Sequence, residues 1–273
     1  MVIKMENKTL NLNIACGDTY LANSSWINID YESNNKNVTQ CDILKKIPFK
    51  ENSFSNIYSS HFIEHIPLEQ IDFFFKMCFK LLKQNGKIRI VTPDFIEIIN
   101  SYIEAVQNDE IELSEFIKIE LLDQLVRNRE GGRLRYVFKK YINENNNKMI
   151  NVINERLGYN LLENSKKNNR EKKTSYFKII SNRITNFYIK FIINFLPSTF
   201  KNQNVLLTKV GENHKWLWDY YDLKKKLESI GFKNVIKKDF NNSGIENFPF
   251  ELDQKNNFPR KGIQSMFVEA EKN

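Results

Sequence analysis

Apolar positions repeat along the chain with two periods, which predict alternating strands and helices. Between Leu68 and Leu82 the apolar residues recur at helical spacing, and residues 221–231 show the same pattern. Asn85–Gly86 and Gly231 follow these helices, and we expect both to act as C-terminal caps. Short apolar runs predict strands at residues 10–15, 26–30, 55–60, 87–92, 232–237 and 264–270.

This alternation predicts the class of fold. Strands separated by helices form a parallel sheet with right-handed crossovers. We therefore predict an α/β protein with a Rossmann-like, doubly wound sheet that is mostly parallel, has one antiparallel C-terminal strand and carries a helical insertion. Residues 1–98 and 205–273 should form the core, and residues 99–204 the mostly helical insertion.

The insertion combines helical patterns with a Gly131–Gly132 turn and a polar stretch rich in Lys and Asn at 163–173. We expect it to form a lid over an acceptor site or a contact between subunits. Its residues 184–196 are apolar on most faces of a helix. Such a helix is buried, lies in a homodimer contact or rests on a membrane surface, as Lys190 and the basic run before it allow. Burial or dimerisation is the expectation.

Composition narrows the class of protein. With 41% hydrophobic and 27% charged residues, the 273-residue chain has an ordinary globular composition. Its 41 Lys and Arg against 33 Asp and Glu give a net charge of +8, which would suit nucleic acid or an anionic substrate. The chain is also crowded with Asn, Lys and Ile, so we interpret most of this charge as solvated lysine and expect no nucleic-acid partner.

Cysteines and apolar runs bear on metal binding and location. Cys16, Cys41 and Cys78 are scattered, with no C-x-x-C pair and no histidine cluster at zinc-ligand spacing beside them, so no metal site is predicted. Scattered thiols in odd number are typical of a reducing compartment. No signal-peptide pattern precedes Leu12 and no run reaches about 18 apolar residues. We therefore expect a cytoplasmic protein without a transmembrane segment.

The turn after the first predicted strand is a candidate ligand site, because ligands of such sheets bind beyond the carboxyl ends of the strands. In Ala15–Tyr20, Gly17 allows the backbone to approach a ligand closely. A pyrophosphate-binding turn needs a small residue three positions later, where this chain has Tyr20. The turn therefore favours a ligand with a nucleoside but without a pyrophosphate.

Two carboxylates at the following strand ends fit the same ligand. Asp30 ends the second predicted strand and can accept hydrogen bonds from both hydroxyls of a ribose. Asp42 can accept from an adenine amino group while Ile43 covers the ring face. Each aspartate alone is equally typical of a turn or a helix cap. Their order after Gly17, on successive strand ends, favours the nucleoside site.

Several stretches carry a resemblance to a known family: Leu12–Gly17, Trp26–Asp30, Ile47–Phe54, Tyr58–His65, Leu82–Asp94, His214–Trp218 and Ser265–Ala270. They resemble class I S-adenosylmethionine-dependent methyltransferases, and within these the predicted methyltransferases of bacterial surface-polysaccharide gene clusters. The resemblance is strong over about residues 10–100 and moderate over 212–271.

The resemblance implies S-adenosyl-L-methionine as the cofactor. It implies that the turn Ala15, Cys16 and Gly17 lies against the methionine part, Asp30 at the ribose, Asp42 with Ile43 at the adenine, and Ser60 with His61 beside the sulfonium. The family usually has Gly where this chain has Ala15. Because Ala is the smallest alternative, we expect adjusted rather than abolished binding.

Methyl transfer to a hydroxyl is helped by a base that removes the acceptor proton, and histidine is the usual choice. His61 follows the fourth parallel strand and is equally typical of a cap for the next helix. His214 precedes two tryptophans where the insertion rejoins the sheet, a pattern typical of a pocket mouth or of core packing. Asp94 follows the next strand, either as a base or as the N-cap of a helix starting at Phe95. The catalytic candidates are therefore His61, Asp94 and His214.

Gln124 and Arg127 are the candidate acceptor contacts. Arg holds phosphate or carboxylate groups through two hydrogen bonds, and nucleotide sugars and phosphorylated glycans carry such groups. The alternative pairs Arg127 with Asp123, four residues earlier, as an exposed ion pair on a helix.

These residues predict an S-adenosylmethionine-dependent methyltransferase. We expect O-methylation of a small molecule, a nucleotide-linked sugar or a component of a surface glycan. An RNA methyltransferase or nucleic-acid binder is the alternative that the net charge of +8 suggests. A non-catalytic scaffold that binds the cofactor is the alternative that Ala15 suggests.

Overall fold

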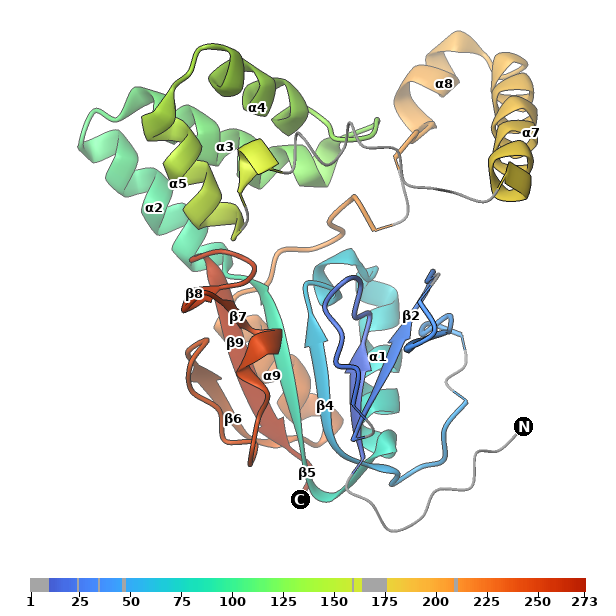
Figure 1. The fold of residues 1–273 in the computed structure, drawn as a ribbon, viewed down its shortest axis with the longest axis vertical. Coiled ribbons are helices and arrows are strands. Elements are labelled where there is room, and N and C mark those ends of the chain that lie inside the picture. Colours follow the sequence, from blue (N-terminus) through green and yellow to red (C-terminus); the bar gives the residue numbers. More distant parts are fainter. Residues whose placement is uncertain are drawn as a thin grey trace.

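The sheet that the sequence predicts is the centre of the molecule (Figure 1). The computed structural model describes residues 10–23, 25–33, 35–45, 48–158, 160–163, 176–208 and 211–273. Its seven-stranded sheet has the order β3-β2-β1-β4-β5-β9-β6. The strands are β1 (Asn11–Ile14), β2 (Trp26–Asp30), β3 (Val38–Gln40), β4 (Phe54–Ser60), β5 (Leu82–Pro93), β6 (Lys233–Lys238) and β9 (Ser265–Glu271).

Strand pairing confirms the predicted fold class. β1 runs parallel to β2 and β4, β2 to β3, and β4 to β5. The C-terminal β9 is antiparallel to both of its neighbours, β5 and β6. The order of the first five strands is the Rossmann order, in which the chain reverses direction across the sheet between β1 and β4. This Rossmann-like sheet therefore has its ligand-binding crevice beyond the carboxyl ends of β1, β2 and β4.

Two helices cover one face of the sheet. α1 (Leu68–Leu81) and α9 (Tyr220–Ile230) pack on each other and on β5 and β6. Their apolar side chains join those of the strands in the main core, with Phe74, Phe75 and Leu227 fully buried. Helical spacing of apolar residues therefore predicted both the helices and the face that each one buries.

One predicted helix cap is wrong. α1 ends at Leu81, and Leu82 is already extended and begins β5, so Asn85–Gly86 lies within the strand rather than at the helix end. Asn85 has a φ of 61°, and a Cβ on Gly86 would lie 2.8 Å from the Lys83 carbonyl oxygen and 2.9 Å from that of Ser55. Glycine is therefore needed at this position, where β4 and β5 approach each other closely. In the sequence alone, the Asn–Gly pair resembles a helix cap.

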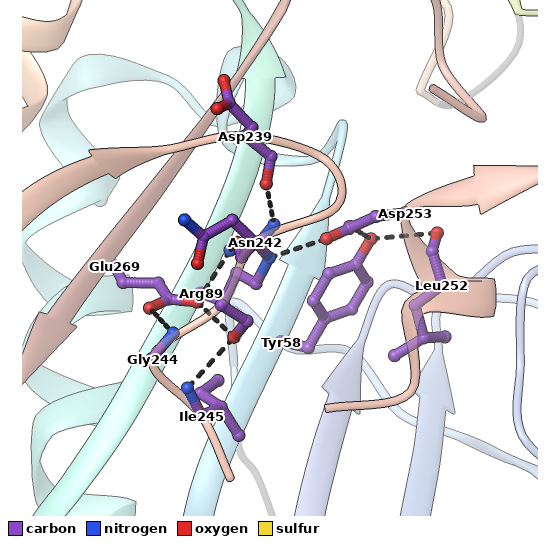
Figure 2. Close-up of polar contacts among 10 residues, drawn as sticks. Tyr58, Arg89, Asp239, Asn242, Gly244, Ile245, Leu252, Asp253 and Glu269 are labelled. Carbon is purple, nitrogen blue, oxygen red and sulfur yellow. Dashed lines mark hydrogen bonds and ion pairs between the residues drawn. The ribbon is translucent and has the colours of Figure 1, made fainter. Parts of the chain in front are cut away.

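A buried arginine network covers the opposite face of the sheet (Figure 2). Arg89 of β5 is fully buried, and its Nε donates to Asp253 Oδ2 at 2.7 Å. Its Nη1 donates to Glu269 Oε1 at 2.7 Å, and its Nη2 to the Asp239 carbonyl at 2.8 Å. Tyr58 of β4 donates to Asp253 Oδ1 at 2.7 Å. The network thus ties residues 239–253, including the short helix η2 (Phe250–Leu252), to the middle of the sheet.

Most helices of the chain lie between β5 and α9. They are α2 (Phe95–Gln107), α3 (Ile111–Val126), α4 (Leu134–Asn143), α5 (Asn147–Leu157), α7 (Tyr176–Asn194) and α8 (Ser198–Asn204). Helices α2 to α5 share a second core with Phe116, Ile117 and Ile153, beyond the carboxyl ends of the parallel strands (Figure 1). Most of the polar stretch at 163–173 lies outside the described residues.

The apolar helix at 184–196 is not buried in this chain. Its large apolar side chains are solvent exposed, Phe187 by 73% and Phe195 by 74%. Figure 1 shows α7 and α8 apart from both the sheet and the α2–α5 group. Burial within the chain is therefore wrong as an explanation for this apolar helix. Across the part of the chain that the structure describes, no helix has the length and apolar character needed to cross a membrane.

Candidate active site

The turn after β1 has the geometry of a ligand-binding turn. Asp30, the last residue of β2, accepts a hydrogen bond from Gly17 N at 2.8 Å and one from Glu32 N at 3.2 Å. A Cβ built on Gly17 meets nothing within 4 Å, so open space lies beside the backbone. Asp30 thus fixes the turn, and Gly17 leaves room for a ligand against it. Both features fit the methionine and ribose parts of S-adenosylmethionine.

Ala15 stands in the backbone conformation that glycine favours. Its φ is +53°, a left-handed value that costs a residue with a Cβ about 1–2 kcal/mol. Gly17, two residues later, has the same φ. The position at which this chain departs from the family pattern is therefore a strained one, and the turn keeps its shape in spite of it.

We expect Ala15→Gly to raise the free energy of unfolding by up to about 1 kcal/mol, because glycine adopts this φ without strain. Urea denaturation of the two proteins measures the change. Asn145→Gly, also at positive φ (51°), is the control with a smaller gain, because Asn tolerates this conformation. If Ala15→Gly were less stable than the parent, the backbone strain inferred at Ala15 would be contradicted.

Asp42, Ile43 and Cys16 lie at the neighbouring strand ends. Asp42 follows β3 by two residues, accepts from Leu44 N at 3.3 Å and pairs with Lys45 at 3.1 Å. Ile43 and Cys16 are buried. Burial, helped by the charge of Asp30, raises the pKa of the Cys16 thiol to about 12, so the thiol stays protonated at pH 7. The order of β3, β2 and β1 in the sheet brings Gly17, Asp30 and Asp42 to adjacent positions.

A pocket of about 420 Å³ lies between the strand ends and the helical insertion. Thr19 of the ligand-binding turn and His61 after β4 line it from the core side. Ile98, Leu121 and Gln124 line it from the insertion. The remaining lining residues are Pro93, Glu120, Arg156, Leu157, Gly158, His214, Leu217, Lys255, Arg260, Lys261 and Gln264. Two of the three catalytic candidates thus reach one cavity next to the ligand-binding turn.

His61 is held in a defined orientation in this pocket. Its Nδ1 lies 3.2 Å from Glu64 Oε1, and its Nε2 lies 3.0 Å from Ser265 Oγ. Its φ of +50° is a strained value that directs the side chain away from the strand. The following helix η1 (Ile63–His65) has Phe62 as its N-cap residue and no side-chain cap. The alternative role of His61 as a helix cap is therefore wrong.

Glu64 is a candidate site residue that the sequence motifs did not single out. It is fully buried and accepts a hydrogen bond from Thr92 Oγ1 at 3.2 Å. Burial by itself favours the neutral acid, but the hydrogen bond from His61 and the charges of the three histidines lower the pKa of Glu64 to about 2. The resulting carboxylate favours the proton on His61 Nδ1, so Nε2 is the unprotonated nitrogen and accepts from Ser265 Oγ.

His214 shares the pocket with His61 and is buried. Its backbone N–H donates to the Gln124 carbonyl at 2.9 Å, which joins the loop before α9 to α3. Burial lowers the pKa of His214 to about 4, so its imidazole is neutral at pH 7. A neutral ring in the pocket wall can accept or donate a hydrogen bond but adds no charge.

One group of side chains could hold a metal ion. In the described part of the chain, the ligand atoms of Glu64, His65 and His214 lie within 4.8 Å of one another. His65 donates its Nδ1–H to the Asn213 carbonyl at 3.0 Å, which leaves its Nε2 free. The sequence predicts no metal site because His214 lies about 150 positions after the adjacent pair Glu64 and His65.

Asp94 serves as a helix cap. Its Oδ1 accepts from Ile96 N at 3.1 Å and Glu97 N at 3.4 Å, and it is the N-cap of α2. Its Oδ2 pairs with Lys237 Nζ at 2.6 Å. Asp94 is not among the residues that line the pocket of His61. The cap alternative is confirmed, and both carboxylate oxygens of Asp94 already have partners.

The two candidate acceptor contacts separate in the structure. Gln124 lines the pocket, whereas Arg127 does not. Arg127 Nη2 donates to Asp123 Oδ2 at 2.8 Å, and Asp123 also accepts from Arg133 N at 2.6 Å. The expected ion pair therefore exists, but it is buried rather than exposed, because Asp123 caps the start of α4 inside the insertion.

A cationic wall of the pocket could not be seen in the sequence. Lys255, Arg260 and Lys261 come from the hairpin of β7 (Gln254–Lys255) and β8 (Phe258–Pro259) and the loop after it. The Arg260 guanidinium donates to the Glu251 and Gln254 carbonyls, so its charge is held in place and not neutralised. The pocket carboxylate of Glu120 already pairs with Arg156 at 2.7 Å. The wall therefore presents net positive charge.

Part of the chain matches the model of a known protein family. Residues 10–90 match the model described as a methyltransferase domain. This segment runs from the start of β1 into β5 and contains the turn with Gly17, Asp30, Asp42 and the His61–Glu64 pair. The match covers less than half of the chain and supports a methyltransferase that uses S-adenosylmethionine as its cofactor. No curated protein matches the chain.

Solved structures similar to this chain include several methyltransferases. A SAM-dependent methyltransferase from Archaeoglobus fulgidus is 15% identical, with 97% of this chain and 87% of that chain covered and a TM-score of 0.41. An S-adenosylmethionine-dependent methyltransferase from Mesorhizobium loti is 17% identical, with 33% and 47% covered and a TM-score of 0.27. The phosphoethanolamine N-methyltransferase 2 from Haemonchus contortus, solved with S-adenosyl-L-methionine, is 19% identical, with 42% and 34% covered and a TM-score of 0.26.

Proposed function

We propose that this protein is an O-methyltransferase whose acceptor carries a negatively charged group, such as a nucleotide-linked sugar or a phosphorylated component of a surface glycan. The observation that carries the proposal is the pocket of about 420 Å³ that joins His61 to the cationic wall of Lys255, Arg260 and Lys261. Cationic side chains without a carboxylate partner favour an anionic ligand. The resemblance to methyltransferases of surface-polysaccharide clusters supports the same acceptor class.

His61 is the base in this proposal. The bound cofactor supplies an electrophilic methyl group on its sulfonium. The acceptor oxygen would take this methyl group as the S–CH₃ bond breaks, and S-adenosylhomocysteine would leave. His61 Nε2 takes the proton from the acceptor hydroxyl, and the Glu64 carboxylate stabilises the imidazolium through Nδ1–H. Gln124, from α3, and the cationic wall hold the acceptor so that its hydroxyl faces His61. His214 contributes a neutral wall.

The helical insertion at 99–204 supplies one side of the acceptor site. Ile98, at its boundary, and Leu121 and Gln124 line the pocket opposite the strand ends. These residues support the role of a lid made of α2 to α5. The three cysteines are buried and none of them forms a disulfide, which suits the reducing environment of a cytoplasmic protein.

Calorimetry with S-adenosylmethionine and S-adenosylhomocysteine tests the function. Absence of binding for both compounds at millimolar concentration would end the proposal. A transfer assay then compares nucleotide-linked sugars with neutral oligosaccharides as acceptors. Turnover of the neutral oligosaccharides alone would remove the anionic acceptor but leave the methyltransferase in place.

We expect Asp30→Ala to weaken binding of S-adenosylmethionine by about 1.5–3 kcal/mol, because charge-assisted bonds to the ribose are lost. The variant also loses the acceptor for Gly17 N. Asp30→Asn is the matched control, since its amide oxygen still accepts hydrogen bonds and should weaken binding less. Both variants are measured by calorimetry, with circular dichroism to establish folding. Unchanged affinity in a folded Asp30→Ala protein would remove Asp30 from the site.

A further inference from the structure

The positive charge of this protein is concentrated in one segment. Residues 164–205, which contain α7 and α8, hold nine Lys or Arg and one Glu, a net charge of +8. The whole chain also has a net charge of +8, so the other residues sum to zero. The basic composition of the chain is therefore a property of this segment and not of the methyltransferase core.

The same segment exposes a continuous apolar stripe. Ile184, Phe187, Tyr188, Phe191, Ile192 and Phe195 follow the helical spacing that places side chains on one face. Their exposed fractions run from 44% for Ile192 to 74% for Phe195. Phe200 of α8 is a further exposed ring, at 51%. Lys190 falls outside this stripe.

From these observations we propose that α7 and α8 form a docking surface for an anionic lipid bilayer. Aromatic and aliphatic side chains on one face of a basic helix enter the boundary between headgroups and acyl chains, while Lys and Arg contact the lipid phosphates. The helix then lies in the plane of the membrane surface, and its 19 residues contribute one long contact. The catalytic core would be held beside the bilayer.

Charge complementarity decides between the possible occupants of this surface. A second copy of the chain would bring a second segment of net charge +8 against the first, and like charges repel. RNA would attract the charge, but base stacking does not use a stripe that includes Ile184 and Ile192. An anionic bilayer matches both the apolar stripe and the positive charge.

The test is co-sedimentation with vesicles. The full chain should bind vesicles of phosphatidylcholine mixed with phosphatidylglycerol, and binding to pure phosphatidylcholine should be weaker by on the order of 10²-fold or more. Added salt should weaken the first interaction, because exposed charges are screened. Equal binding to both vesicles, or none to either, overturns the proposal.

Two sets of variants separate the apolar and the charged contributions. Phe187→Gln, Phe191→Gln and Phe195→Gln together should lower vesicle affinity by at least about 100-fold, because three aromatic side chains no longer leave water. The matched control carries Ile111→Gln, Val126→Gln and Tyr221→Gln, which are exposed by 68%, 74% and 76% on other helices, and should bind like the parent. Glutamine favours helix, so α7 should remain folded.

The charge variant combines Lys178→Gln, Lys190→Gln and Lys201→Gln in α7 and α8 and should weaken binding by up to about 100-fold. Its control carries Lys76→Gln, Lys224→Gln and Lys225→Gln in α1 and α9. It removes the same charge from the methyltransferase core, so its vesicle affinity should change little.

Light scattering then measures whether the chain forms a dimer, and a mobility-shift assay measures RNA binding. A dimer that the Phe→Gln variant abolishes, or RNA binding that only the Lys→Gln variant weakens, would overturn the lipid assignment. Binding of S-adenosylmethionine should be unchanged in all variants.

Discussion

Arg89→Met should lower the free energy of unfolding by about 3–5 kcal/mol. The substitution leaves Asp253 and Glu269 buried without their cation, and uncompensated buried charges are strongly destabilising. Tyr58 keeps its hydrogen bonds to Asp253 and to the Leu252 carbonyl. Chemical denaturation with urea measures the loss. Residues 239–253 should become more accessible to protease, since Arg89 ties them to β5.

A matched control removes a cation from a partly exposed ion pair, so that the cost of burial can be measured separately. Lys226 of α9 pairs with Asp72 at 2.7 Å, but the side chains are 32% and 49% exposed. Lys226→Met should therefore cost less than about 1 kcal/mol. Adding Asp253→Asn and Glu269→Gln to Arg89→Met should restore part of the stability, because no unpaired charge remains. A loss of under 1 kcal/mol in Arg89→Met would show that the network contributes little.

His61→Asn should lower the rate of methyl transfer by about 10²–10⁴, the usual contribution of a general base. Binding of S-adenosylmethionine should change little, because Asp30 and the turn around Gly17 are untouched. The rate is measured with an acceptor that the parent protein methylates. His65→Asn is the control, since His65 does not line the pocket and its Nδ1 is bonded to the Asn213 carbonyl. Full activity of His61→Asn would make His61 structural and favour His214 as the base.

The pH dependence of the rate gives a second measurement of the same role. Burial lowers the pKa of His61 below its usual 6.5, and the hydrogen bond that His61 donates to Glu64 opposes this shift only in part. Only the neutral imidazole takes a proton, so the rate should be constant above pH 6.5 and fall only as the pH drops through the lowered pKa. An ordinary histidine would already lose rate near pH 6.5, and such a profile would contradict the buried environment.

Local sequence patterns were enough to predict the sheet, the helices that cover one of its faces and the position of the candidate ligand-binding turn. Period-two and helical spacing depend on neighbouring residues, so Trp26–Asp30, Leu68–Leu81 and the antiparallel Ser265–Glu271 were predicted close to their observed bounds. Parallel strands with right-handed crossovers bring their carboxyl ends to one edge. The same rule predicts that Gly17, Asp30 and Asp42 lie at neighbouring strand ends, as the strand order confirms.

Contacts between distant residues set the burial and pairing of the side chains in the candidate site and in the buried network. Arg89 meets Asp253 across 164 residues of sequence, and His65 meets Asn213 across 148. The burial of Glu64, the pairing of Asp94 with Lys237 and the cationic pocket wall arise from such distant contacts. The exposure of Phe187 and Phe195 was also decided there, because an apolar helical period is the same whether its face meets a core, a partner or a bilayer. Periodicity records which side chains share a face, and the fold of the whole chain determines what that face meets.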